Sequence, residues 1–250
     1  MFDLNNKTAL VTGGARDIGR AVSLCLARSK AKVAINYFDN PEDAQETLKL
    51  IEVEGGSATT IQGDMTNWDS VQNCVKKTVE TYGKIDILVN VAGGLMGRKT
   101  IVEMEEIFWD NVMNVNLKSV FLVCKAAIPN MNDNGAIVNF TSQAARDGGG
   151  FGAIAYASAK GGVLTFTRGL AKELGSRKIR VNAVSPGMIN TTFHNVFTKP
   201  EIRSKVAAAT PLGREGEASE VASLVLFLTS DASSFINGTA IEINGGTYFV

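Results

Sequence analysis

The sequence predicts an α/β fold in which helices cover both faces of a largely parallel sheet. Short β-rich runs alternate with longer stretches of helical periodicity along the chain. The first five runs are nearly all apolar instead of alternating, so both faces of these strands should be buried. Repeated strand–helix units of this length imply right-handed crossovers and a doubly wound sheet. No linker interrupts the 250 residues, 45% of which are hydrophobic, and we expect residues 1–250 to form one domain.

Each expected strand is marked by a short run of apolar and β-branched residues. The seven runs cover residues 8–12, 32–37, 58–63, 86–92, 135–142, 179–185 and 239–245. The expected helices follow the first five runs, over residues 18–29, 42–54, 68–81, 103–130 and 154–175. Periodicity is weaker after the sixth run, where residues 188–212 are interpreted as a variable lid.

Composition and charge argue against several classes of protein. The 25 basic and 25 acidic residues cancel, which argues against a nucleic-acid binder. The sequence contains no run of about 18 uncharged apolar residues, so no membrane span is expected. The N-terminal sequence lacks the features of a secretory signal, so a cytoplasmic location is expected. Cys25, Cys74 and Cys124 lie far apart without metal-ligand spacing, so they are expected to pack in the core and no metal site is expected.

Glycine-rich turns follow four of the expected strands, at residues 12–19, 90–94, 141–150 and 185–192. Ligands of open parallel sheets bind beyond the carboxyl ends of the strands, so these turns predict a binding site at one edge. The first turn leads into a helix whose free N–H groups attract phosphate, and Gly13 and Gly19 permit a close backbone approach. Asp17 lies within this turn. We expect its carboxylate to turn aside and to accept hydrogen bonds from backbone or from a ribose hydroxyl.

Tyr156 and Lys160 are four residues apart and should be neighbours on one helix face. A phenol with a pKa near 10 is a poor acid or base at neutral pH. An adjacent ammonium favours the phenolate, so Lys160 is expected to lower the pKa of Tyr156. Ser142 ends a buried strand at the same edge, where its hydroxyl can hold a substrate oxygen beside the phenol.

The sequence resembles the short-chain dehydrogenase/reductase family over essentially the whole chain. The motifs that carry this resemblance are Thr12–Gly19, Asp64, Asn90–Gly93, Asn116, Ser142, Tyr156 with Lys160, and the segments 180–187 and 227–246. The resemblance implies a Rossmann-like three-layer αβα sandwich with a seven-stranded, mostly parallel sheet. It also implies an NAD(P)-dependent oxidoreductase that transfers hydride between a nicotinamide and a carbonyl or alcohol, and it suggests a homotetramer.

The resemblance assigns roles to individual residues. Tyr156 is implied to be the general acid or base, Lys160 to lower its pKa and bind the nicotinamide ribose, and Ser142 to orient the carbonyl oxygen. Asn116 is implied to hold a water that relays protons to Lys160, and Asp64 to bind the adenine. The implied cofactor contacts are Tyr156, Lys160, Gly13, Arg16, Asp17, Ile18, Gly19, Tyr37, Asp64, Met65, Asn90, Ala92, Gly93, Pro186, Gly187, Ile189 and Thr191.

Two departures from the family pattern bear on cofactor preference. Asp17 stands where a glycine is usual, and Val91 where a second asparagine is usual. An acid at the end of the second strand selects NAD, but Tyr37 occupies that position here. Arg16 matches the basic residue of NADP-dependent relatives. NADP(H) is therefore favoured, with NAD(H) as the alternative.

The substrate prediction depends on the lid and on nearby cations. The lid sequence resembles reductases of 4-deoxy-L-erythro-5-hexoseulose uronate, a keto-sugar acid. Arg146, which follows Ser142, and His194, the single histidine, are candidate substrate contacts; Arg98 and Lys99 are further cations after the fourth strand. Solvated loop charges and a structural histidine are the simpler alternatives. A 3-oxoacyl-[acyl-carrier-protein] reductase and a non-catalytic, cofactor-binding scaffold are the other two functions considered.

Overall fold

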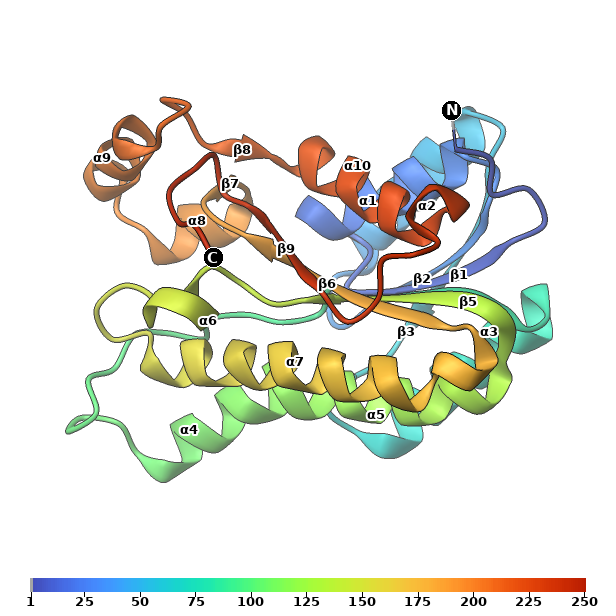
Figure 1. Ribbon diagram of the computed structural model, residues 1–250, viewed down its shortest axis with the longest axis horizontal. Coiled ribbons are helices and arrows are strands. Elements are labelled where there is room, and N and C mark those ends of the chain that lie inside the picture. Colours follow the sequence, from blue (N-terminus) through green and yellow to red (C-terminus); the bar gives the residue numbers. More distant parts are fainter. Residues whose placement is uncertain (1) are drawn as a thin grey trace.

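The computed structural model describes residues 2–250, and it has the predicted architecture of helices on both faces of a parallel sheet (Figure 1). Seven strands form one sheet in the order β3-β2-β1-β4-β5-β6-β9, and every neighbouring pair is parallel. The strands are β1 (Thr8–Thr12), β2 (Lys32–Tyr37), β3 (Ser57–Gln62), β4 (Ile85–Asn90), β5 (Met131–Phe140), β6 (Arg180–Pro186) and β9 (Ala240–Ile243). The strand order reverses between β1 and β4, which makes that position the switch point where ligands bind in such sheets.

Ten helices are described, and most of them form the two outer layers. They are α1 (Asp17–Arg28), α2 (Pro41–Val53), α3 (Trp68–Tyr82), α4 (Glu106–Met113), α5 (Ser119–Ala127), α6 (Ala144–Asp147), α7 (Ile154–Glu173), α8 (Thr192–Phe197), α9 (Pro200–Ala209) and α10 (Ala218–Thr229). In Figure 1, α1, α2 and α10 cover the upper face of the sheet, and α3, α5 and α7 cover the lower face. Helices α8 and α9 stand apart from both layers, at the left edge.

The apolar strands explain the two layers, because successive side chains of a strand point to opposite faces. On β1, Ala9 and Val11 pack into the core beneath α1 and α10, whereas Leu10 packs into the core beneath α3, α5 and α7. Cys74 and Cys124 lie in this second core, and burial raises the pKa of each thiol to about 12. The expectation that the cysteines pack is therefore confirmed for these two.

The long helix expected over 103–130 begins at Glu106 and is not regular. A π-helical turn, Asn114–Lys118, separates α4 from α5, and a short 3₁₀ turn ends the segment at Asn130. By length and composition Glu106–Asn130 could cross a membrane, but half of its most apolar window is buried inside the molecule, as in a core helix.

Three further elements differ from the sequence prediction. Helix α10 was not expected; it begins with a capping box in which Glu217 and Glu220 each accept a backbone N–H. Strand β5 begins at Met131 instead of residue 135. The lid contains α8 and α9, and a small sheet of β7 (Ile189–Asn190) and β8 (Gly216–Glu217) joins its two ends.

Candidate active site

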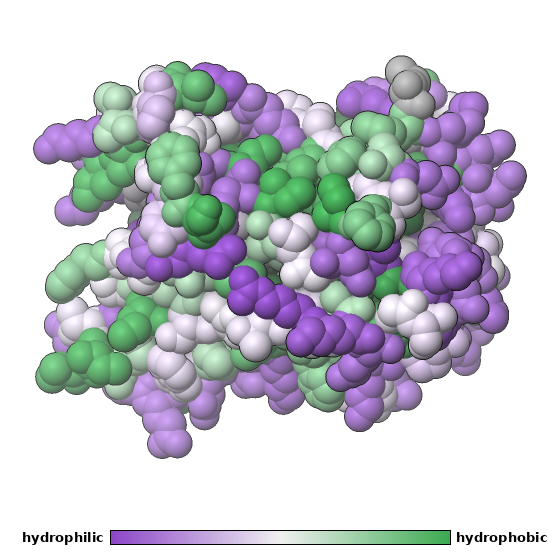
Figure 2. Space-filling view, viewed as in Figure 1, coloured by the Kyte–Doolittle hydropathy of each residue, from purple (hydrophilic) through white to green (hydrophobic). Residues whose placement is uncertain are grey.

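The glycine-rich turns and the expected catalytic residues follow the carboxyl ends of β1, β4, β5 and β6, which face the left side of the molecule in Figure 1. Figure 2 shows the surface hollowed at this edge, between the lid helices above and the segment around α6 below. This is the crevice that parallel-sheet topology predicts.

The turn between β1 and α1 has the shape of a phosphate cradle. Gly13 adopts a left-handed φ of +63°, and a Cβ on Gly19 would lie 1.9 Å from the Gly13 carbonyl oxygen. No side chain caps α1 at its N-cap residue, Arg16, so the first N–H groups of the helix are not taken up by a capping side chain. These features fit a pyrophosphate bound through the main chain.

Asp17 turns away from this cradle, as expected. One carboxylate oxygen accepts the backbone N–H of Thr192 at 2.9 Å, and the other accepts the Thr192 hydroxyl. The backbone of Asp17 is left-handed, with φ of +50°. The negative charge of the turn is thus directed at the lid.

Tyr156, Ser142 and Lys160 come together where β5 meets the start of α7. The nearby Ser142 side chain favours the ionised phenol, which partly offsets the rise in the pKa of Tyr156 that burial causes. Lys160 is buried, its Nζ donates to the Phe140 carbonyl at 2.8 Å, and burial lowers its own pKa to about 8.

The expected effect of Lys160 on Tyr156 is therefore corrected. The ammonium nitrogen lies 5.7 Å from the centre of the Tyr156 ring, and its hydrogen bond goes to a backbone carbonyl instead of the phenol. Burial raises the pKa of Tyr156, and the effect of Ser142 offsets only part of that rise, so the pKa is raised, not lowered. The phenol is protonated at neutral pH, which suits a proton donor.

Asn116 lies in the π-helical turn and is fully buried. Its amide donates to the carbonyls of Gly94 and Val112 at 2.8 and 2.9 Å, and its oxygen accepts the Gly94 N–H at 3.0 Å. A Cβ on Gly93 would lie 2.9 Å from the Asn116 oxygen and 3.2 Å from Lys160 Nζ. Asn116 thus fixes the loop after β4 beside Lys160, and its relay of protons stays a prediction.

The other expected cofactor residues divide into two groups. One group is exposed or partly exposed at the crevice edge of the fold: Gly13, Arg16, Ile18, Tyr37, Asp64, Ala92, Gly93 and Gly187. The other group is buried at the same strand ends: Gly19, Met65, Pro186, Ile189 and Thr191. Asp64 accepts the backbone N–H and the hydroxyl of Thr66, both at 2.8 Å, which fixes the turn after β3.

The expectation that the Asn90 side chain lines the cofactor is corrected, because this side chain lies in the core instead of the crevice. It is 2% exposed, and its amide donates to the Asn139 oxygen at 2.9 Å. Its own oxygen is buried without a hydrogen-bond partner. Any contact of Asn90 with a cofactor is left to its backbone.

The two candidate substrate contacts are not available as free cations. Arg146 pairs with Glu242 of β9 at 3.1 Å, with both side chains less than one-fifth exposed. His194 Nδ1 lies 3.0 Å from the Thr198 hydroxyl, and burial lowers the pKa of this imidazole, which keeps it neutral at pH 7. Arg98 donates to the carbonyls of Phe151 and Phe197. Arg146 therefore already has a partner in the ligand-free protein, and its contact with a substrate stays a prediction.

An aromatic wall next to Tyr156 was not predicted. The Phe193 ring of α8 lies 6.3 Å from the Tyr156 ring and 5.2 Å from that of Phe197, between centroids. The four-residue spacing of the two phenylalanines in the lid was the available signal, since it places both on one helix face.

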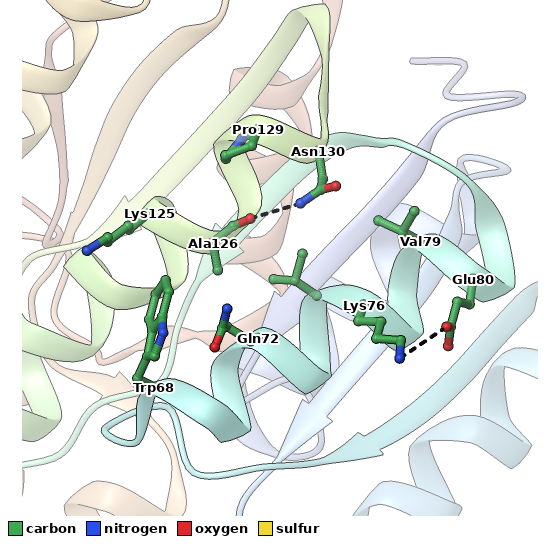
Figure 3. A pocket seen from close by; sticks show the side chains of 10 residues that line it. Trp68, Gln72, Lys76, Val79, Glu80, Lys125, Ala126, Pro129 and Asn130 are labelled. Atoms are coloured by element: carbon green, nitrogen blue, oxygen red, sulfur yellow. Dashed lines mark hydrogen bonds and ion pairs between the residues drawn. The ribbon is translucent and has the colours of Figure 1, made fainter.

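A second hollow lies far from these residues. A groove of about 480 Å³ lies between α3 and α5. Figure 3 shows its lining, with Trp68 and Lys125 at one end. The Lys125 ammonium lies 5.1 Å from the Trp68 ring, a cation–π contact. None of the expected catalytic or cofactor residues lines this groove.

Known proteins identify the family. The sequence model described as "Enoyl-(Acyl carrier protein) reductase" matches residues 13–248. The 3-oxoacyl-[acyl-carrier-protein] reductase FabG of Staphylococcus epidermidis is 37% identical, over 97% of this chain and 99% of its own. A short-chain dehydrogenase/reductase from Serratia marcescens is 32% identical with a TM-score of 0.92, covering 97% of this chain and 98% of that one. A blue fluorescent protein from a metagenomic library, solved with NADPH, is 31% identical with a TM-score of 0.92, covering 99% of this chain and 100% of that one. The chain belongs to the short-chain dehydrogenase/reductase family.

Proposed function

We propose that this protein reduces a carbonyl to an alcohol with NADP(H), and that Tyr156 is the proton donor. The observation that carries the proposal is that the Tyr156 phenol, the Ser142 hydroxyl and the buried Lys160 ammonium come together beside the crevice. Burial raises the pKa of the phenol, so it holds its proton at neutral pH until a carbonyl oxygen becomes basic.

Three side chains of the protein have distinct roles in the proposed reduction. The nicotinamide, when bound, supplies hydride to the carbonyl carbon. The Ser142 hydroxyl donates a hydrogen bond to the carbonyl oxygen, and Tyr156 transfers its proton to the same oxygen. Lys160, held by the Phe140 carbonyl, provides positive charge near the phenolate that results. In the reverse direction Tyr156 is the base.

Arg16 supports the proposed preference for NADP(H). Its side chain is 61% exposed at the start of α1, and the neighbouring strand β2 ends in Tyr37 instead of an acid. A guanidinium can accommodate a 2′-phosphate, whereas a carboxylate at the strand end would bind the ribose hydroxyls of NAD. One relative of similar structure was solved with NADPH. We expect Arg16→Ala to raise KM for NADPH about tenfold and to change KM for NADH less than twofold.

For the substrate we propose a 3-oxoacyl thioester, the class named for the FabG relatives. The wall beside Tyr156 is aromatic, and Arg146 is paired with Glu242, which makes this arginine less suited to binding a substrate carboxylate. An acyl chain buries apolar surface against such a wall at about 25 cal/mol per Å². A keto-sugar acid such as 4-deoxy-L-erythro-5-hexoseulose uronate lacks that apolar surface and carries an unpaired charge.

The test compares these substrates with both reduced nicotinamides, following loss of the nicotinamide absorbance. Acetoacetyl-CoA with NADPH should give the highest kcat/KM, and Tyr156→Phe should lower it by about 10³-fold while the protein still binds NADPH. A higher kcat/KM for the keto-sugar acid would overturn the substrate assignment alone. Full activity in Tyr156→Phe would overturn the mechanism, and no turnover of any carbonyl would favour a non-catalytic scaffold.

We also propose that the protein is a cytoplasmic homotetramer, as the family resemblance implies. Apolar side chains are exposed on α4 and α5, including Ile107 and Phe121, at 62% and 44%. Such side chains suit burial between subunits. Light scattering at several protein concentrations tests the assembly, and a monomer at all concentrations would overturn it.

A further inference from the structure

Asp17 joins the phosphate turn to the lid across 175 residues of sequence. Its carboxylate accepts both the N–H and the hydroxyl of Thr192, the first residue of α8. Hydrogen bonds to an ionised acceptor are stronger than neutral ones. Two of them on one residue fix both the position and the rotation of the first turn of α8.

Among the described residues, no side chain at the N-cap of α8 binds the first N–H groups of this helix. The N-cap residue Thr191 makes no capping hydrogen bond, because its hydroxyl donates back to the Ile189 carbonyl at 3.2 Å. Arg203 of α9 holds the rest of the lid together: it pairs with Glu215 and hydrogen-bonds to Asn195 of α8 and Asn190 of β7, but to no residue of the phosphate turn. Asp17 is therefore the described link between the start of the lid helix and the nucleotide-binding edge.

Thr192 precedes Phe193, whose ring lies beside Tyr156. A shift of the first turn of α8 would move this ring relative to the phenol. The position of Asp17 thus sets the width of the space in which a carbonyl must approach Tyr156.

We propose that Asp17 is a positioning residue for the lid: its bonds to Thr192 hold Phe193 beside Tyr156 and so determine the affinity for the carbonyl substrate. This explains why an acid is useful in a turn that binds a phosphate. The carboxylate oxygens are hydrogen-bonded by two donors from the lid, and the main chain of the turn is left for the anion. The contacts with the lid do not depend on the reaction; the consequence for substrate affinity rests on the proposed function.

Hydrogen exchange of the ligand-free protein tests the contacts directly. In Asp17→Gly, amides of the peptide covering residues 191–198 should exchange about tenfold faster than in the native protein. Asp17→Asn retains an oxygen for the Thr192 N–H and should stay within threefold of native. Thr192→Val should give an intermediate increase. The double variant Asp17→Gly/Thr192→Val should exchange no faster than Asp17→Gly alone, because both changes break the same link.

A matched control separates the lid contact from the backbone effect of glycine. Asn134 also has a left-handed backbone, with φ of +62°, and is exposed at the remote end of β5. Asn134→Gly should leave exchange of residues 191–198 unchanged. Trypsin cleavage after Lys205 gives a second measurement of lid opening in the same variants.

Kinetics on whichever carbonyl the native protein turns over test the consequence. Asp17→Gly and Thr192→Val should each raise KM for the carbonyl about fivefold, keep kcat within twofold and change the dissociation constant of NADPH less than threefold. Additive effects in the double variant, or unchanged exchange of the lid in Asp17→Gly, would overturn the proposal. So would a loss of NADPH affinity with an unchanged lid, since Asp17 would then act on the cofactor. Accelerated exchange without turnover of any carbonyl would support the lid contact and count against the proposed function.

Discussion

Replacing Lys160 by methionine should abolish reduction and yet stabilise the protein at neutral pH. Methionine has a similar length and no charge, so it fills the same space in α7 without the cost of burying an ammonium. The native lysine pays that cost: its pKa falls from 10.5 to about 8, and each unit corresponds to about 1.4 kcal/mol. The full penalty at pH 7 is therefore about 3 kcal/mol, less about 1 kcal/mol for the hydrogen bond to Phe140 that methionine cannot make.

The sign of the pH dependence follows from the lowered pKa. Between pH 8 and 10.5 the unfolded chain binds the proton of Lys160 and the folded protein releases it, so the stability of the native protein rises with pH. Below pH 8 both states are charged and the penalty is constant. The stability advantage of Lys160→Met should thus shrink by about 2 kcal/mol between pH 7 and 9.5.

Urea unfolding at equal protein concentrations, from pH 7 to 9.5, measures this difference. Other groups that titrate in this range, including the buried thiols, are present in both proteins and cancel in the subtraction. Lys172→Met, which removes an exposed lysine from the same helix, is the control and should give a constant difference. A constant difference for Lys160→Met as well would refute the argument that burial dominates at this position.

Two further predictions concern the turn and the loop beside the catalytic residues. Gly19→Ala should prevent the turn from closing, since its Cβ would lie 1.9 Å from a backbone oxygen. Calorimetric titration of this variant should therefore show no NADPH binding. The control is Gly169→Ala, which has open space around its Cβ and should bind NADPH as the native protein does. Arg146→Ala should destabilise the protein by about 3 kcal/mol, because it leaves Glu242 buried with no cation and with one oxygen already lacking a partner. The pair Arg146→Met/Glu242→Gln should recover most of this loss in a thermal unfolding assay, and an equal loss in both variants would contradict the charge argument.

Local patterns in the sequence predicted most of the fold because they report burial directly. The apolar strands, such as residues 8–12, and the turn glycines at their ends identified the sheet and its binding edge. Tyr156 and Lys160 could be recognised from their spacing on one helix. Helix α10 was not recognised because it is apolar almost all round, so it lacks the periodicity of a helix with one polar face.

The remaining features depend on contacts between residues far apart in the chain. Arg146 and Glu242 are 96 positions apart, so nothing near Arg146 in the sequence indicates that its charge is already paired. Asp17 and Thr192 are 175 positions apart, so their contact could not be predicted from the sequence either. The raised pKa of Tyr156 could not be predicted either, because it depends on how deeply α7 packs, which spacing alone does not reveal.

The rotation of α4 about its own axis depends on the Asn116 side chain in the π-helical turn Asn114–Lys118. The Asn116 amide takes the Val112 carbonyl that a main-chain N–H would bind in a regular helix. A side chain without that donor, such as leucine, would favour relaxation of the segment by one residue. Each residue of an α-helix turns by about 100°, so α4 would rotate by roughly that amount about its axis and point a different set of side chains at α7.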